Sequence, residues 1–376
     1  MVPVKMVHVR KYLALVLAVV LLPALVAGAA ISPEMIRVAL FRGIEAVRVE
    51  GAGILLTDQK GDPVRATSPL DIRRGRDSLT VNGASVTGLI ISSPAYITVN
   101  GKRYRGILEC QPEAKGMLVI NKLPLEEYLV GLINCEISSQ WPMESVKAQA
   151  VIARSYALYQ KNARRSALYD LESSVMDQVY QGSDIEDSRA GRGVEETAGE
   201  VLTFDGNIIQ AFYHSNCGGH TEAAANVWGY PLPYLQGVDC KYCATAPSFR
   251  WEQTIPLKKI ENQLRAAGFN AAGLKGILPG MRNGSGRISE LTLLTSAGKI
   301  TVPAPKFRMA IGSTIIKSTN FEVTTADETA SFSGIGYGHG VGLCQWGAKQ
   351  RAVDGFDYRE ILAYYYPGVR LSKSAQ

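Results

Sequence analysis

The sequence predicts an α+β fold in which an antiparallel β-rich unit precedes a mixed helix-and-strand core that carries an insertion. Short β-type runs, separated by Asn-Gly pairs that favour tight hairpin turns, fill the chain from about residue 31 to 111. Two helical patterns of apolar and small residues follow between residues 124 and 157. From residue 247 to about 332 the sequence pattern changes, and this stretch has neither histidine nor cysteine.

The first 29 residues have the pattern of an export signal. Three basic residues precede an apolar run from residue 12 to 27, and Ala27-Gly28-Ala29 resembles a cleavage site. Cleavage and retention as an uncleaved membrane anchor both remain open, although Pro23 interrupts the run. We therefore expect an exported protein of the periplasm or cell envelope, either secreted or held by this segment, with no other membrane contact.

Composition argues for a folded protein and against a nucleic-acid partner. Of its 376 residues, 46% are hydrophobic and 20% are charged, as in ordinary globular domains. The formal net charge is +6, and three of these charges lie within the first eleven residues. The remaining +3 (6 − 3) is too small to predict binding to nucleic acid.

Residues 30–111 are interpreted as the N-terminal β-rich unit. Strands are predicted at residues 36–40, 46–49, 53–56, 79–81 and 96–99, with hairpin turns at Asn82-Gly83 and Asn100-Gly101. The unit contains no histidine and no cluster of chemically reactive side chains. A structural or binding role is therefore expected for it.

Residues 112–246 are predicted to form the first part of the catalytic core. A strand at residues 116–120 precedes a helix that begins after Pro124, and a second helix begins at Pro142. Short strands are expected at residues 179–181 and in a hairpin at 201–209. The segment between the two helices, residues 134–141, is expected to be a non-helical hinge.

The hinge carries one acidic residue, Glu136, which is the candidate catalytic group. A carboxylate between two packed helices and close to Trp141 is a candidate for a raised pKa; the alternative is an ordinary solvated side chain. The adjacent Glu126 and Glu127 point in different directions on a helix, so they do not form the carboxylate pair of a glycosidase. If Glu136 is catalytic, it is expected to act without a second carboxylate.

A second cluster has the spacing of a metal site. Cys217 and His220 are followed by Cys240 and Cys243, two close pairs of sulfur and nitrogen ligands that suit tetrahedral zinc. His214 competes as a fifth candidate, and a disulfide that involves Cys217 is the alternative in an exported protein. A site with four protein ligands is closed, so a structural role is expected rather than a catalytic one.

The remaining two segments are an insertion and the C-terminal part of the core. Residues 247–332, with an amphipathic helix pattern at 258–267, are interpreted as an insertion; substrate contact is one option for its role, which the sequence leaves open. Residues 333–376 form the C-terminal part, where alternate glycines from Gly334 to Gly342 allow close backbone approach. Helices are predicted at residues 345–353 and 358–366.

Several motifs occur in the order found in one known family. They are Leu123–Gly131, Glu136, Lys147–Ala157, Asp177–Gly182, His214-Ser215 with Gly218-Gly219, Pro233–Leu235, Gly336–Gly342 with Gln345–Ala348, and Tyr365–Gly368. From about residue 100 to the end, the chain resembles the stage II sporulation protein D family, which includes amidase-enhancer proteins. The sequence departs from the common pattern at two positions. Cys135 directly precedes Glu136, and Cys344 stands where serine is frequent.

The resemblance implies a peptidoglycan lytic transglycosylase. Such an enzyme cleaves the bond between N-acetylmuramic acid and N-acetylglucosamine to give a 1,6-anhydro product, and the family's catalytic glutamate maps onto Glu136. Zinc in some members supports the zinc interpretation. The further substrate-binding candidates are Gln149, Arg154, His214, Ser215, His339 and Gln345; for Gln149 and Arg154 a plain helix-surface role is the alternative.

Other functions remain open at this point. The implied substrate is the peptidoglycan glycan strand, but a non-catalytic enhancer of a cell-wall amidase has the same motifs. Zinc-dependent amide hydrolysis at the cysteine and histidine cluster is a third possibility. A serine nucleophile at Ser215 is not expected, because the chain has no G-x-S-x-G elbow there.

Overall fold

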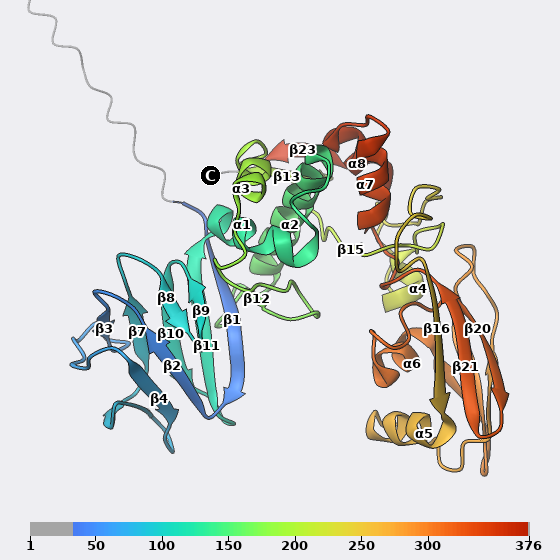
Figure 1. Cartoon of the computed structure of the whole chain (residues 1–376), viewed down its shortest axis with the longest axis horizontal. Helices are drawn as coiled ribbons and strands as arrows, with labels where there is room; N and C mark the ends of the chain where they lie inside the picture. The colour runs from blue at the N-terminus through green and yellow to red at the C-terminus, as the bar shows by residue number, and fades with distance from the viewer. Residues whose placement is uncertain (1–32, 375–376) are drawn as a thin grey trace, which may run out of the picture. The chain divides into compact units, whose positions relative to one another are not determined.

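The computed structural model describes residues 33–374 and confirms the α+β class (Figure 1). Helices combine with sheets whose strands pair mainly in antiparallel fashion. The predicted export signal or anchor, residues 1–29, lies outside the described residues. Among the helices that are described, none is long and apolar enough to cross a membrane.

Two six-stranded sheets, with strand orders β12-β1-β11-β10-β7-β3 and β6-β5-β4-β2-β8-β9, form the N-terminal part. Their strands are β1 (Met35–Ile44), β2 (Ala46–Glu50), β3 (Leu55–Thr57), β4 (Leu70–Arg74), β5 (Leu79–Val81), β6 (Ala84–Val86), β7 (Leu89–Ser92), β8 (Ile97–Val99), β9 (Lys102–Tyr104), β10 (Ile107–Pro112), β11 (Met117–Pro124) and β12 (Leu171–Glu172). The predicted turns are confirmed, because Asn82 and Asn100 both have a φ of 48° before a glycine of positive φ. β4 and β7 lie where no strand was predicted.

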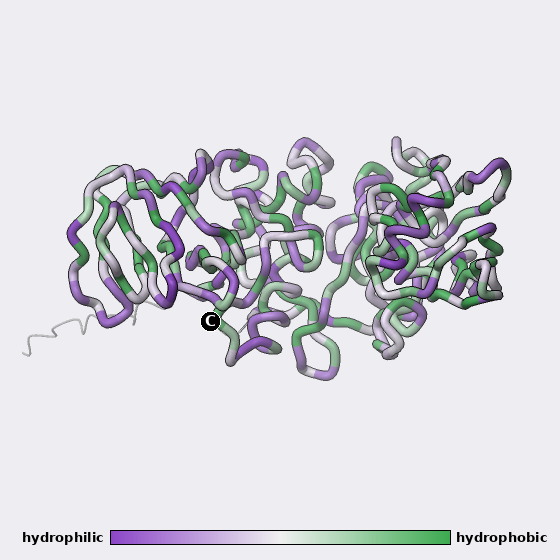
Figure 2. The backbone as a smooth tube through the Cα atoms, turned by 90° about the horizontal axis from the view of Figure 1, so that it is seen from below, coloured by the Kyte–Doolittle hydropathy of each residue, from purple (hydrophilic) through white to green (hydrophobic). Residues whose placement is uncertain are grey.

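Alternation of buried and exposed residues explains how these strands pack. In β2, Val47 and Val49 are buried while their neighbours are exposed, and Figure 2 shows hydrophobic and hydrophilic residues close together along the strands of this part. β11, which follows the predicted unit boundary at residue 111, is buried along most of its length and lies between β1 and β10. One hydrophobic core therefore extends from these strands to the helices that follow.

Helices α1 (Leu125–Glu136) and α2 (Met143–Ala163) confirm the predicted helix pair. Around them lie α3 (Ser188–Glu195), β13 (Glu200–Phe204), β14 (Asn207–Ile208), β15 (Tyr213–His214), α4 (Ala224–Trp228), β22 (Leu343–Cys344), α7 (Gln345–Val353), α8 (Tyr358–Tyr365) and β23 (Arg370–Lys373). α2 packs against α1, α3, α7 and α8, so it connects the early core with the C-terminal part (Figure 1). The hairpin predicted at residues 201–209 is confirmed. The strand predicted at residues 179–181 is wrong: that segment is irregular and turns toward α1.

The segment predicted as an insertion has its own hydrophobic core. It contains β16 (Arg250–Pro256), α5 (Leu257–Ala266), β17 (Gly276–Pro279), β18 (Glu290–Thr295), β19 (Gly298–Pro303), α6 (Ala304–Ile311), β20 (Phe321–Ala326) and β21 (Thr329–Ile335). The strands form two three-stranded sheets, β16-β21-β20 and β17-β18-β19. The predicted helices at residues 258–267, 345–353 and 358–366 are confirmed as α5, α7 and α8.

Candidate active site and sulfur cluster

Glu136 is the last residue of α1, so it lies at the end of a helix and not within the hinge. The correction is local: the helix continues through Asn134 and Cys135, and the chain becomes extended at Ile137 (φ −140°, ψ 165°). The buried face of α1, which includes Tyr128, holds the helix in the core. The position of Glu136 is therefore set by the packing of the whole helix.

Burial raises the pKa of the Glu136 carboxyl to about 7, against the effects of the Tyr213 hydroxyl, the Val179 backbone amide and the Gln345 side chain, which favour the charged form. A carboxylate at the C-terminal end of a helix is also disfavoured by the helix dipole. No lysine or arginine contributes to this shift. Glu136 can therefore carry a proton near neutral pH, as a general acid must.

The groups that face Glu136 belong to a buried network of neutral side chains. Gln178 donates from Nε2 to the Tyr213 hydroxyl (3.2 Å) and to the Ala153 carbonyl (3.4 Å). Its Oε1 accepts a hydrogen bond from the Tyr128 hydroxyl (3.0 Å). Residues from α1, α2, the loop after β12 and β15 thus meet around one carboxyl group.

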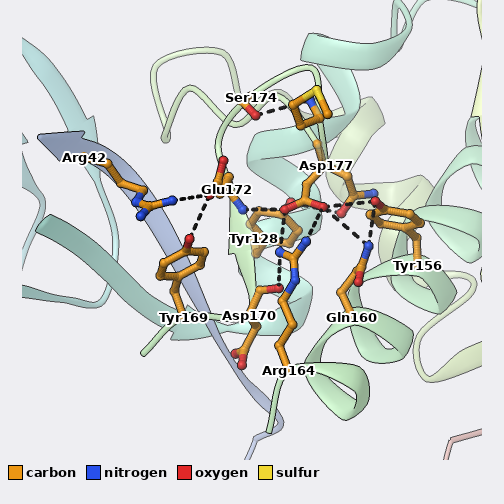
Figure 3. Close-up of polar contacts among 12 residues, drawn as sticks. Arg42, Tyr128, Tyr156, Gln160, Arg164, Tyr169, Asp170, Glu172, Ser174 and Asp177 are labelled. Carbon is orange, nitrogen blue, oxygen red and sulfur yellow. Dashed lines mark hydrogen bonds and ion pairs between the residues drawn. The ribbon is translucent and has the colours of Figure 1, made fainter. Parts of the chain in front are cut away.

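Asp177 orders the loop that brings Gln178 and Val179 to the site (Figure 3). Its buried carboxylate accepts hydrogen bonds from Arg164 (2.6 Å), the Tyr156 hydroxyl (3.1 Å) and the Glu172 backbone N–H (2.8 Å). Arg164 and Tyr156 come from the end of α2 and from α2 itself. These contacts attach the loop to the helix immediately before Gln178, which donates to the Tyr213 hydroxyl, and Val179, whose backbone amide acts on Glu136.

Gln345 is the first residue of α7 and connects this helix to α2. Its Nε2 donates to the Oε1 of Gln149 (3.3 Å), and both side chains are buried. Of the predicted substrate-binding residues, Gln345 therefore acts on the Glu136 carboxyl, and Gln149 is joined to it through Gln345. The Nε2 of Gln149 is left as a buried donor without a partner among the described residues.

Partly exposed aromatic residues lie next to both contact residues in the chain: Trp346 follows Gln345, and Phe212 precedes Tyr213. Trp141 packs against Trp346, with ring centroids 5.0 Å apart, and the Nζ of Lys349 lies 4.4 Å from the Trp346 ring. Phe212, which precedes Tyr213, stacks on Trp228 at 4.2 Å. Flat aromatic faces of this kind suit the apolar faces of sugar rings.

His214 and His339, the two histidines of the glycine-rich segments, lie side by side, and their lowered pKa values do not suit acid–base catalysis. The rings of His214 and His339 are 5.6 Å apart, and burial lowers the pKa of His339 to about 3 and that of His214 well below its ordinary value. His214 Nδ1 lies 3.1 Å from the Val341 carbonyl oxygen. Both rings are therefore neutral at physiological pH.

Arg154 has structural contacts in place of the predicted substrate contacts, whereas the backbone of Ser215 joins two elements and its predicted substrate role stays a prediction. Arg154 is fully buried, pairs with Glu126 (2.6 Å), and donates to the carbonyls of Val194 (3.3 Å) and Glu200 (3.1 Å). These bonds occupy the guanidinium, so the prediction that it lines the substrate groove is corrected. The carbonyl of Ser215 accepts the Trp346 N–H (3.1 Å), which joins the segment after β15 to α7.

Four buried cysteines come together in the core beside α7. The sulfur atoms of Cys217, Cys240, Cys243 and Cys344 all lie within 4.8 Å of one another. The prediction of His220 as a ligand is corrected, because its ring turns to the Thr221 carbonyl and to Asp239, and Cys344 occupies the fourth position. All six cysteines of the described chain are free, and the Cys217 and Cys243 sulfurs are 3.5 Å apart, well beyond the ~2.05 Å of a disulfide.

The donor set and its surroundings fit a metal ion. Four sulfur atoms in a closed, buried group are the donor set of structural zinc sites. The Sγ of Cys344 accepts hydrogen bonds from the backbone amides of Cys217 (3.3 Å) and Gly347 (3.4 Å), and it caps the N-terminus of α7. Such contacts stabilise a thiolate.

The residues that sequence reasoning missed are Tyr213, Gln178, Val179, Arg287 and Cys344. Two signals were available. Gln178 and Val179 lie in the segment Asp177–Gly182, which was already noted as a motif, and Cys344 replaces a common serine. No sequence pattern pointed to Arg287, which donates to the Cys217 carbonyl (2.6 Å) from the loop before β18.

Comparisons with known proteins find two family models and several relatives that match this chain. A family model described as "Stage II sporulation protein" matches residues 113–204, and one described as a domain of unknown function matches residues 233–342. An uncharacterized protein of Brachyspira hyodysenteriae is 34% identical over 78% of this chain and 79% of its own length. The amidase enhancer of Bacillus subtilis is 30% identical over 65% of this chain and 40% of its own length. The stage II sporulation protein D of Bacillus subtilis is 28% identical over 68% of this chain and 76% of its own length.

Proposed function

Because the chain belongs to the stage II sporulation protein D family, we propose that it is a lytic transglycosylase that cleaves peptidoglycan glycan strands in the cell envelope. The observation that carries the proposal is a single carboxyl, Glu136, whose pKa burial raises to about 7 among neutral hydrogen-bonding groups. One acid that can also act as a base meets the requirement of this reaction. Its nucleophile is part of the substrate.

In the first step, the protonated Glu136 donates its proton to the glycosidic oxygen between N-acetylmuramic acid and N-acetylglucosamine. The bond from C1 to that oxygen breaks, the N-acetylglucosamine alcohol leaves, and positive charge develops at C1. The Tyr213 hydroxyl and the Gln345 amide favour the carboxylate that results. They therefore stabilise the state in which Glu136 has lost its proton.

In the second step, the Glu136 carboxylate removes the proton of the muramic acid 6-hydroxyl, and the oxygen closes onto C1. The product is a 1,6-anhydro sugar, and Glu136 regains its proton. No water is consumed and no second carboxylate is required, because the attacking hydroxyl is held in the same molecule. The aromatic rings of Trp346 and Trp228 are suited to hold adjacent sugars.

Digestion of purified cell walls tests this function. The products are read by mass spectrometry for 1,6-anhydro muropeptides, with Glu136→Gln beside the wild type. Glu127→Gln is the matched control, since it makes the same change on the same helix. We expect anhydro product from the wild type and the control but not from Glu136→Gln; full activity of Glu136→Gln would overturn the assignment.

The similarity to an amidase enhancer favours one second candidate, a non-catalytic stimulator of a cell-wall amidase. The chain spans 40% of that relative's length, so any amidase partner is itself part of the proposal. The discriminating measurement is release of stem peptides by an added amidase. Stimulation that is equal for the wild type and Glu136→Gln, without anhydro product from either, would favour the enhancer.

A further inference from the structure

The two side chains that contact Glu136 from the C-terminal half come from a very small strand pair. Tyr213 belongs to β15 and Gln345 directly follows β22. The strands pair in parallel, with Tyr213 opposite Leu343 and His214 opposite Cys344. A pair of two-residue strands has little rigidity of its own, so something else must hold it in place.

The four-cysteine cluster lies at the end of this strand pair. Cys344 is the last residue of β22, and Cys217 follows β15 by three positions. The Cys217 N–H donates to the Cys344 sulfur (3.3 Å). The other two members, Cys240 and Cys243, come from the loop that follows α4. Any ion bound to all four sulfurs would therefore tie β15 to β22 and to the start of α7.

A buried cation lies beside the cluster. The Arg287 side chain is buried and donates to the carbonyls of Cys217 (2.6 Å) and His220 (2.9 Å). Its positive charge is favoured first by the buried Glu222 and then by the cluster cysteines Cys217, Cys344 and Cys243. Four thiolates around a divalent cation carry a net charge of about −2, which is compatible with a neighbouring cation, whereas two disulfides would be neutral.

We propose that Cys217, Cys240, Cys243 and Cys344 bind one zinc ion, and that this ion positions Tyr213 and Gln345 against Glu136. Zinc is the choice because four soft sulfur ligands in a closed group suit it. With four protein ligands there is no open position for a reactive water, so the ion has no part in hydrolysis. The four cysteines are positioning residues, and the catalytic consequence of their loss rests on the proposed function.

Metal content is the first test. We expect one zinc ion per purified chain by elemental analysis, and loss of that ion in Cys344→Ser. Two controls retain it: Cys110→Ser, which changes a buried cysteine of β10 outside the cluster, and His220→Ala, which removes the ligand favoured by sequence spacing. A chain without zinc whose denatured form has lost four titratable thiols to disulfides would overturn the site.

The second test follows the Glu136 carboxyl directly, by carbon NMR titration of glutamate-labelled protein, with Glu136→Gln to assign the signal. The zinc-bound wild type is expected to titrate near pH 7. Cys344→Ser, and wild type stripped by a chelator, are expected to titrate higher by roughly one pH unit, because the Tyr213 hydroxyl and the Gln345 side chain, which favour the carboxylate, are displaced. Gln345→Ala should shift it in the same direction with zinc retained.

The outcomes separate this proposal from the proposed function, since neither measurement needs catalysis. An unchanged Glu136 titration in folded, zinc-free protein would overturn the positioning role. Global unfolding on zinc loss, seen by circular dichroism, would also overturn it, because the ion would then support the whole fold and not this contact. A zinc-dependent titration without any anhydro product would sustain this inference and reject the transglycosylase.

Discussion

The carboxyl groups of Asp177 and Glu136 have opposite electrostatic surroundings. Asp177 faces the guanidinium of Arg164 at 2.6 Å and accepts hydrogen bonds from three further residues. Glu136 faces a tyrosine, a glutamine and a backbone amide, with no cation among its partners. The presence of a cation distinguishes the two sites: Asp177 forms an ion pair that orders its loop, while Glu136 has no cation among its partners and burial raises its pKa.

The largest effect expected from this comparison is on catalysis. Glu136→Gln keeps the size and hydrogen-bonding capacity of the side chain but removes its exchangeable proton. We expect a loss of about 10²–10⁴-fold in the rate of anhydro-product release. The rate is measured on isolated glycan strands, and Glu127→Gln should stay near wild type. A loss that is equal in both variants would show that α1 is merely sensitive to substitution.

Asp177→Asn is expected to act on stability first. It leaves Arg164 without its carboxylate and loosens the loop that carries Gln178 and Val179. Because the Arg164 side chain is 34% exposed, we expect a cost of about 1–3 kcal/mol, less than for a fully buried pair. Urea unfolding measures it. Wild-type stability in Asp177→Asn would mean that the ion pair does not organise the loop.

The pH dependence of stability should distinguish Glu136 from an ordinary carboxyl. Its pKa rises from 4.5 to about 7 on folding, so between these values the folded state binds a proton that the unfolded state has released. Wild-type stability therefore falls as pH rises through this window, by up to about 3 kcal/mol. Glu136→Gln lacks this fall and should be more stable than wild type at pH 8. Parallel pH profiles for the two proteins would contradict the raised pKa.

The smallest effect is expected from Tyr213→Phe, which removes one hydroxyl that favours the charged Glu136. The pKa of Glu136 should rise, and the alkaline limb of the pH–rate profile should move to higher pH. The first step is slower because Glu136 becomes a weaker acid when its carboxylate is less stabilised, so we expect a rate loss of roughly tenfold. His339 and His214 do not contribute to this limb, since both are neutral. A limb that stays in place would remove Tyr213 from the acid–base group.

Local patterns in the sequence determined the parts of this protein that depend on neighbours along the chain. The helix pair around Glu136, the Asn-Gly turns and the C-terminal helices follow from apolar periodicity and turn chemistry, which act over a few residues. β4 and β7 were missed although the shorter β5 was predicted, so strand length does not explain the omission. Residues 179–181 were predicted as a strand from their β-forming residues, but Tyr180 packs against Tyr128 of α1, with ring centroids 5.0 Å apart, and the segment is irregular.

Only the tertiary structure decided which distant residues meet. Spacing favoured His220 as the fourth ligand because it lies close to Cys217 in the chain, but the parallel pairing of β15 with β22 brings Cys344 there from 127 positions away. Arg154 carries a side chain of the kind that often binds substrate. Only the packed structure shows that its guanidinium is already bonded to Glu126 and to two backbone carbonyls. Glu136 could be identified as a candidate acid from the sequence, yet its acidity depends on burial and on Tyr213 and Gln345, which are distant in the chain and near only in space.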